Sequence, residues 1–178
     1  MNEKIFDELF TEVKSGTKLA FENIQANHKG EGIASFALYS DNDALTICTT
    51  ACTQAHFDNL EDWMYFEEWD CDWEEIDCLD KATDVLSRIH EVFDQTLDSN
   101  PEEKHEDLWR ANTNLIFVTI VKALKSLLDE GLFGSEGERE RFFLNFDISD
   151  SGVSDEDHKN WVRQLNTENV FNEYKSKA

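Results

Sequence analysis

The stretch I-A-S-F-A-L-Y-S-D-N-D-A-L-T-I-C-T-T, residues 33–50, decides the fold class of this 178-residue chain. Its two flanks, 33–40 and 44–50, are rich in β-branched and aromatic residues, which favour strands. Between them lies Asp41-Asn42-Asp43, whose side chains bond nearby backbone amides and so favour a turn. The stretch therefore predicts a β-hairpin.

The sequence before the hairpin predicts one long helix over residues 3–27. Apolar residues recur there at helical spacing from Ile5 to Ile24. Gly16 interrupts the pattern, but a helix tolerates a single glycine at a modest cost. The glycines at 30 and 32 favour a helix end, because glycine readily adopts the positive φ of a C-cap. After the hairpin, Thr53 is placed to cap a short helix over residues 53–60.

Further along the chain, residues 80–97 and 102–130 predict two more long helices. The second is apolar nearly all round, so we expect it at the centre of the core. Residues 141–149 alternate apolar and polar side chains with the period of a strand. Ser154 begins a capping box, which predicts the start of a final helix.

Few strands among several long helices predict an α+β fold, with a small, largely antiparallel sheet packed against long helices. The chain shows no internal repeat, no low-complexity linker and no interior boundary. Its length also suits one hydrophobic core. We therefore expect a single α+β domain over residues 1–178.

The net charge of the chain indicates which kinds of partner it can bind. Lys and Arg number 16 against 39 Asp and Glu, giving a formal net charge of −23. Self-repulsion at this level is destabilising, so we expect it to serve solubility or the recognition of a cationic partner. Nucleic-acid binding is not expected, because no basic stripe is present to neutralise phosphates.

A cytoplasmic location is expected from three features of the sequence. The N-terminal residues lack the basic and apolar regions of a signal peptide. The longest apolar run, residues 115–121, is far shorter than the ~20 residues that span a membrane. The four cysteines are expected to be free thiols.

Residues 58–80 read D-N-L-E-D-W-M-Y-F-E-E-W-D-C-D-W-E-E-I-D-C-L-D and form the acidic–aromatic stretch. It holds eleven acids, no base and three of the five tryptophans, and residues 30–80 contain 14 acids with no Lys or Arg. One interpretation is a helix with its rings in the core and its acids in solvent. The other is a binding surface, with rings as anchors and carboxylates that steer a basic partner. The candidate partner-binding residues are Trp63, Tyr65, Glu67, Glu68, Trp69, Asp70, Asp72, Trp73 and Glu74.

No catalytic residue, metal site or cofactor is predicted. Carboxylate pairs are expected by chance at this acid content, and a solvated acidic face does not separate two pKa values as acid–base catalysis requires. Cys48, Cys52 and His56 have the spacing that would place three metal ligands on one face of a helix. However, Cys48 lies in an expected strand, so the three need not share a helix. The sequence contains neither a nucleophile elbow nor a glycine-rich phosphate loop. The other histidines are expected at the surface.

Several short motifs resemble a family of uncharacterised bacterial proteins, the domain-of-unknown-function 4303 family. These are F-A-L-Y-S-D in the hairpin, W-M-Y-F-E-E-W, A-L-K-S-L-L-D-E-G-L-F-G at residues 123–134, D-I-S-D, and R-Q-L-N at residues 163–166. The resemblance covers most of the chain in the same order. It implies an α+β fold and brings no catalytic residues. By analogy, such proteins are similar to small acidic immunity proteins found beside bacterial toxins.

The sequence thus favours a non-catalytic binding module for a basic protein partner, of the immunity or inhibitor kind. Two alternatives stay open. A DNA-mimic protein would occupy a nucleic-acid-binding protein with an extended stripe of carboxylates. A small enzyme would carry perturbed pKa values in a concave pocket that the motifs do not reveal.

Overall fold

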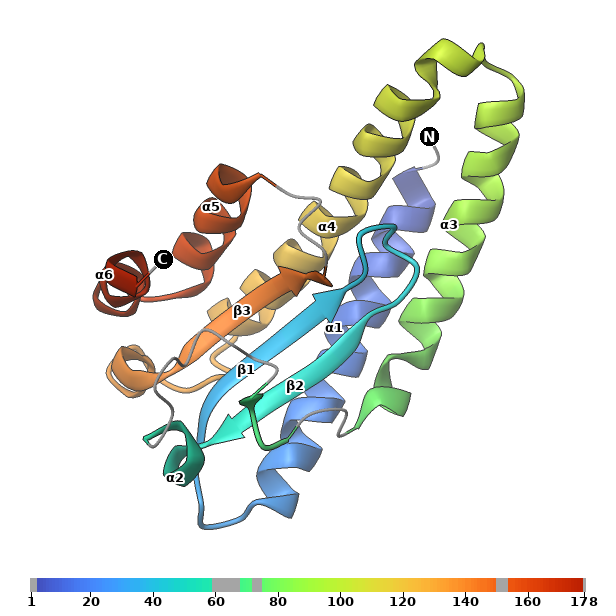
Figure 1. Ribbon diagram of the computed structural model, residues 1–178. Coiled ribbons are helices and arrows are strands. Elements are labelled where there is room, and N and C mark those ends of the chain that lie inside the picture. The colour runs from blue at the N-terminus through green and yellow to red at the C-terminus, as the bar shows by residue number, and fades with distance from the viewer. Residues whose placement is uncertain (1–2, 59–67, 72–74, 150–153, 178) are drawn as a thin grey trace.

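The computed structural model describes residues 3–58, 68–71, 75–149 and 154–177 and has the predicted α+β architecture (Figure 1). Long helices pack against a small three-stranded sheet. In chain order the elements are α1 (Glu3–Asn27), β1 (Ile33–Ser40), β2 (Cys48–Thr53), α2 (Gln54–Phe57), η2 (Ile76–Leu79), α3 (Asp80–Asp98), η3 (Glu102–Lys104), α4 (His105–Asp129), η4 (Glu138–Arg141), β3 (Phe143–Ile148), α5 (Asp155–Leu165) and α6 (Glu168–Lys177).

The sheet has the strand order β2-β1-β3. The predicted hairpin is present, because β1 pairs with β2 in antiparallel fashion, with Ala37 opposite Thr50. The later strand β3 lies parallel to β1 on its other side, with Leu38 opposite Phe146. A parallel pair needs a long connection, and here the two helices α3 and α4 lie within it.

The second strand begins at Cys48, four residues later than the expected start at residue 44. The reason is Asp41, whose carboxylate accepts hydrogen bonds from the backbone amides of Asp43, Leu45 and Thr46. These bonds draw the segment into a turn, and Ala44 there has a φ of 57°, which is not a strand conformation. Burial works to raise the pKa of Asp41, but a hydrogen bond from the hydroxyl of Thr46, together with the three amide bonds, outweighs it and lowers that pKa.

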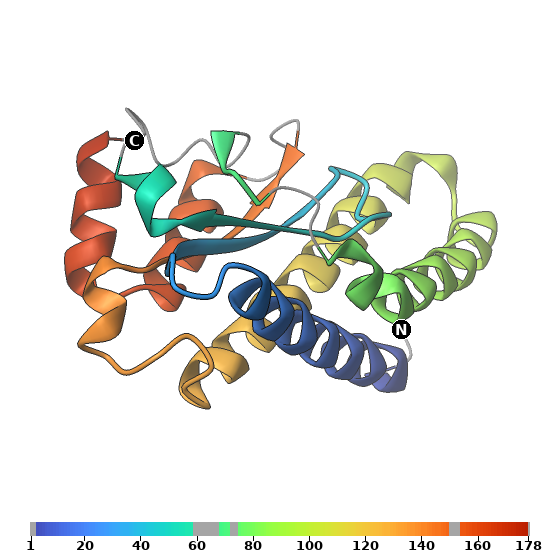
Figure 2. The same cartoon turned by 90° about the horizontal axis from the view of Figure 1, so that it is seen from below.

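One face of the sheet packs on α1 and α4 to form the main core. Figure 2 shows these two helices on one side of the sheet, with α2 and residues 68–71 on the other. Phe36 and Leu144 lie side by side on the helix-covered face and are completely buried. The ring of Phe21 from α1 meets the edge of Phe36 at 5.3 Å between centroids.

A second, smaller cluster covers the opposite face of the sheet. It contains Ala37, Cys52 and Phe143 from the strands. Trp69 and side chains of α5 and α6, including Tyr174, pack against them. Both faces of this small sheet are therefore buried, which places residues 68–71 in direct contact with the fold.

The helix α4 lies at the centre of the core, as its sequence predicts. Leu124 and Ile120 are fully buried on it. The helical stretch Glu102–Asp129 is long and apolar enough to cross a membrane by length and composition alone. Most of its apolar window is buried inside the protein, as the core helix of a globular domain would be.

Two predicted helix caps are confirmed. Thr53 Oγ1 accepts a hydrogen bond from the amide of His56 at the start of α2, and Ser154 Oγ accepts one from the amide of Asp157 at the start of α5. The C-terminal residues form a separate helix, α6, because the backbone of Asn166 turns to an extended conformation after Leu165.

Candidate functional site

Three of the nine predicted partner-binding residues, Glu68, Trp69 and Asp70, lie in the described part of the chain. The side chain of Glu68 is exposed, whereas Trp69 is 4% exposed. The remaining predicted residues lie outside the described residues: Trp63, Tyr65, Glu67, Asp72, Trp73 and Glu74.

Trp69 takes part in packing against the sheet. Its ring meets Phe143 edge-on, at 6.4 Å between centroids. Phe143 in turn stacks on Tyr174 of α6 at 6.2 Å. At this residue the ring contributes to the core, which is the first of the two interpretations of the acidic–aromatic stretch.

Asp70 connects the acidic–aromatic stretch to the end of β2 through hydrogen bonds. Its carboxylate accepts hydrogen bonds from the backbone amide and the hydroxyl of Thr53, at 2.9 and 2.6 Å. Burial works to raise the pKa of Asp70, but these bonds outweigh it and hold the pKa below its usual value. A ring nitrogen of His56 adds a contact to the carbonyl oxygen of Glu68 at 2.8 Å.

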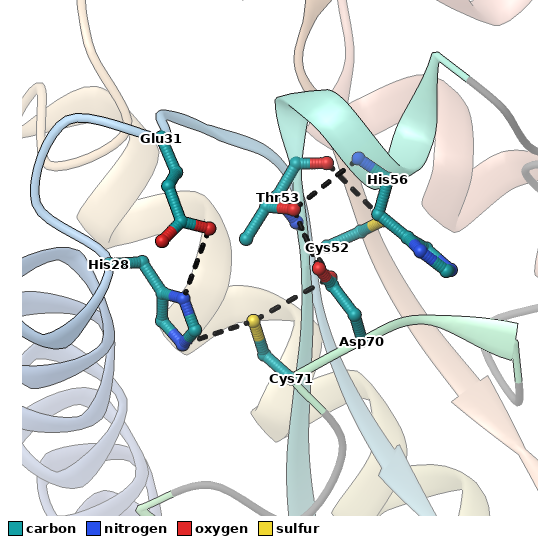
Figure 3. Close-up of polar contacts among 7 residues, drawn as sticks. All are labelled: His28, Glu31, Cys52, Thr53, His56, Asp70 and Cys71. Carbon is teal, nitrogen blue, oxygen red and sulfur yellow. Dashed lines mark hydrogen bonds and ion pairs between the residues drawn. The ribbon is translucent and has the colours of Figure 1, made fainter.

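A thiol–imidazole pair lies next to this junction (Figure 3). The sulfur of Cys71 is 3.4 Å from Nε2 of His28, and Nδ1 of the same ring is 3.7 Å from a carboxylate oxygen of Glu31. An imidazole in this position could accept the thiol proton. However, Cys71 is completely buried, and its sulfur also lies 3.7 Å from the carboxylate of Asp70, which disfavours a thiolate. We therefore interpret the thiol–imidazole pair as a structural contact.

The expectation of surface histidines is wrong for His90, which is 9% exposed and bonds through its ring to the carbonyl oxygen of Ala44. His28 and His158 are half-buried. His158 lies 3.3 Å from the hydroxyl of Tyr174. The sequence did not reveal this burial, because the neighbours of these histidines in the chain are charged. The groups that cover their rings come from distant parts of the chain.

The cysteines are free thiols, and Cys48, Cys52 and Cys71 are buried. Burial, followed by the nearby carboxylate of Asp70, raises the pKa of Cys52 to about 12. Among the described residues, no group of three or more His, Cys, Asp or Glu side chains is arranged to hold a metal ion.

A cleft of about 450 Å³ opens where α2, the start of β3 and α6 meet. The three elements lie at one end of the molecule in Figure 1. The side chains that line the cleft are Gln54, Phe57, Asp58, Glu140, Arg141, Phe142, Phe143, Val170 and Glu173.

The chemistry of this cleft suits a cationic group. It offers the half-buried ring of Phe57 and three carboxylates against the single guanidinium of Arg141, while Phe142 and Phe143 line it from buried positions. Aromatic faces and carboxylates both attract ammonium and guanidinium groups. The lining comes from three distant segments, so only Asp58, the first residue of the acidic–aromatic stretch, could have been singled out from the sequence.

Another cleft, of about 600 Å³, lies between α4 and α5 and is lined in part by Asp107, Arg110 and Asp157. Arg110 is paired there with Glu106 at 3.0 Å. The smaller cleft adjoins the acidic–aromatic stretch through Asp58 and through the contact of Phe143 with Trp69. It is therefore the better candidate for the predicted binding surface.

The fold and the cleft define an acidic α+β domain with a concave surface that is lined by three carboxylates and the ring of Phe57. The family described as a domain of unknown function, DUF4303, matches residues 13–167 of the chain. The chain therefore belongs to this family, and the resemblance carried by its motifs is confirmed. No curated protein and no solved structure matches the chain.

Proposed function

We propose that this protein is a non-catalytic, cytoplasmic binding module that recognises a basic protein partner, in the manner of an immunity or inhibitor protein. The observation that carries the proposal is the cleft between α2, β3 and α6, where three carboxylates lie beside the ring of Phe57. A lysine or arginine side chain of the partner is the group that this cleft suits best.

The charge distribution supports a basic partner. Fourteen acids and no Lys or Arg lie between residues 30 and 80, while a surface that serves solubility alone usually mixes both signs. Such a field accelerates the encounter with a cationic protein and disfavours anionic ones. The free thiols of the chain fit the reducing conditions of the cytoplasm.

The structure of the cleft supports binding without catalysis. Its rim carboxylates, Glu140 and Glu173, lie on exposed positions. An exposed carboxylate suits electrostatic attraction better than proton transfer, which is favoured in an enclosed site. The walls of the cleft come from α2, α6 and the start of β3, so regular secondary structure forms most of the site.

The test is charge reversal at the three carboxylates of the cleft, with Asp58→Lys, Glu140→Lys and Glu173→Lys combined in one variant. We expect the affinity for a basic partner protein, measured by titration calorimetry, to fall by roughly tenfold or more. We also expect the salt dependence of binding to weaken. Asp70 is left intact because its carboxylate holds the end of β2.

A matched control carries the same change of charge away from the cleft, with Glu22→Lys, Asp84→Lys and Asp129→Lys. These three residues are exposed, lie on α1, α3 and α4, and line no part of the cleft. If both variants lost the same affinity for the partner, the effect would come from the overall charge of the protein. That result would contradict a localised site. Binding that follows an extended acidic surface and competes with DNA would favour the DNA-mimic alternative.

A further inference from the structure

A small apolar groove lies far from the cleft, where α1, α3 and α4 come together near the N-terminal end of α1. Its walls are the apolar side chains of Ile5, Phe6, Ile89, Val92 and Phe93. The enclosed space is about 70 Å³. This is well below the ~300–1,000 Å³ of small-molecule pockets and suits a single side chain.

The groove contains an unusual polar group. Asn112 of α4 lines it, and this residue is 1% exposed. Both amide atoms of its side chain are buried without a hydrogen-bond partner among the described residues. A buried amide without partners is destabilising, and asparagine is also a weak helix former in the middle of a helix. A role in binding would explain why this amide lines an otherwise apolar groove.

The amide of Asn112 has the chemistry to bind a peptide backbone. Its Oδ1 accepts a hydrogen bond and its Nδ2 donates one. A peptide unit offers the complementary N–H and C=O groups. Because both amide atoms are buried, a segment seated on the groove would reach Asn112 through its backbone once the side chains around the amide shift, while one apolar side chain fills the space beside it.

The negative charge around the groove favours a positively charged peptide segment. Residues 91–107, which run from the wall of the groove to the start of α4, contain seven acids and one base, Lys104, and one of these acids, Glu106, is paired with Arg110. The seven acids are all exposed. On α1 and α3 the nearby Glu8 and Arg88 neutralise each other in an ion pair at 2.6 Å. A second copy of this chain, with its own charge of −23, would be repelled.

We infer that the groove around Asn112 docks a peptide segment with one apolar side chain flanked by lysine or arginine. The exposed side chain of Val92, at 42% of its surface, marks the accessible wall. The inference rests on the proposed function for the positive charge of the partner. It adds a second contact at the opposite end of the molecule from the aromatic cleft.

The test is a titration of the ¹⁵N-labelled protein with the blocked peptide Lys-Lys-Leu-Lys-Lys, followed by NMR. The matched probe is Lys-Lys-Ala-Lys-Lys, which keeps the charge and loses the apolar side chain. We expect the side-chain amide resonances of Asn112 to shift with the leucine peptide. We expect roughly tenfold weaker binding of the alanine peptide, as for the loss of a few methylene groups from an apolar pocket.

Two variants complete the experiment. Asn112→Leu removes the unpaired amide, so we expect an unchanged or higher melting temperature together with the loss of leucine-dependent binding. Asn114→Ala, an exposed position on the same helix, should bind like the wild type. A merely structural role of Asn112 would not produce this combination of retained stability and lost binding.

Three results would overturn the inference. These are equal affinities for the two peptides, Asn112 resonances that do not move, and shifts that follow protein concentration and so report self-association. The lysines of both peptides can also enter the cleft, so the groove is reported by the Asn112 resonances and by the difference between the two peptides. This readout can fail while the charge reversal at the cleft still weakens partner binding, and the reverse also holds.

Discussion

The backbone amide and the hydroxyl of Thr53 both donate to the carboxylate of Asp70, at 2.9 and 2.6 Å. The same hydroxyl oxygen accepts a hydrogen bond from the amide of His56 and so caps α2. One side chain therefore joins the end of β2, the start of α2 and the acidic–aromatic stretch. In this way the fold holds a strongly acidic segment against the sheet despite its self-repulsion.

Asp70→Asn should destabilise the protein by about 1 kcal/mol at neutral pH, since two hydrogen bonds lose their charged acceptor at a partly exposed site. The folded-state pKa of Asp70 is lowered, so its contribution is present above the unfolded-state value of about 3.9. It is lost as the pH falls through the folded-state pKa. Urea unfolding from neutral pH to pH 3 should show the two proteins converge in acid. Asp77→Asn, at an exposed acid of the same stretch, should show no such pattern.

Gly16→Ala should destabilise the protein although alanine favours helices. A Cβ atom at Gly16 would lie 2.4 Å from the carbonyl oxygen of Cys78 and 2.9 Å from a methyl group of Leu79. The backbone of η2 would have to move away from α1, which we expect to cost more than the ~1 kcal/mol gained in helix propensity. Thermal unfolding provides the measurement. In the control Gly137→Ala the Cβ meets open space, so the change should stay within about 0.5 kcal/mol.

The four thiols should differ in their reaction with a disulfide reagent. Cys78 is half-buried, whereas the other three are buried. Burial, followed by a hydrogen bond to Glu75, raises the pKa of Cys78, so its reaction should be slow at neutral pH and accelerate as the pH rises above 9. Absorbance kinetics should show one reactive thiol in the folded protein and four in denaturant. Cys78→Ser should remove that first phase, and a native protein that reacts at several thiols would contradict the expectation.

The elements that could be predicted from the sequence are those set by local patterns. The helix Glu3–Asn27 and the strand Ile33–Ser40 appear where their periodicity places them. The start of β2 was misplaced because Asp41 engages three backbone amides, which periodicity does not reveal. Within α1, Gly16 resembled a tolerated interruption, yet it permits close packing with η2.

The candidate site was less accessible to sequence reasoning because it depends on tertiary contacts. The acid content of the stretch identified Asp58 and Asp70, but gave no sign that Asp70 bonds to Thr53. Glu140 and Glu173 reach the cleft from distant segments and have no distinctive local pattern. The unpaired amide of Asn112 likewise emerges only when the packing of α1, α3 and α4 is known.

Asn166, the last residue of the R-Q-L-N motif, closes the free edge of β3. Its Oδ1 accepts from the amide of Leu144 at 2.9 Å, and its Nδ2 donates to the carbonyl oxygen of the same residue at 2.7 Å. Nδ2 also lies 2.8 Å from the carbonyl oxygen of Val162, near the end of α5. One amide therefore stands in for a neighbouring strand and joins α5 to the sheet.

Asn166→Ala should lower the free energy of unfolding by roughly 2–3 kcal/mol, because the amide and carbonyl of Leu144 lose their partner in a partly buried position. Asn166→Asp keeps the acceptor but places a carboxylate oxygen against the carbonyl oxygens of Leu144 and Val162, so a loss at least as large is expected at neutral pH. Guanidinium unfolding gives the stabilities, and faster hydrogen exchange at the Leu144 amide would localise the effect. Gln164→Ala, which removes an exposed bond to Asn160, is the control. If Asn166→Ala matched that control in both measurements, the edge of β3 would not depend on this side chain.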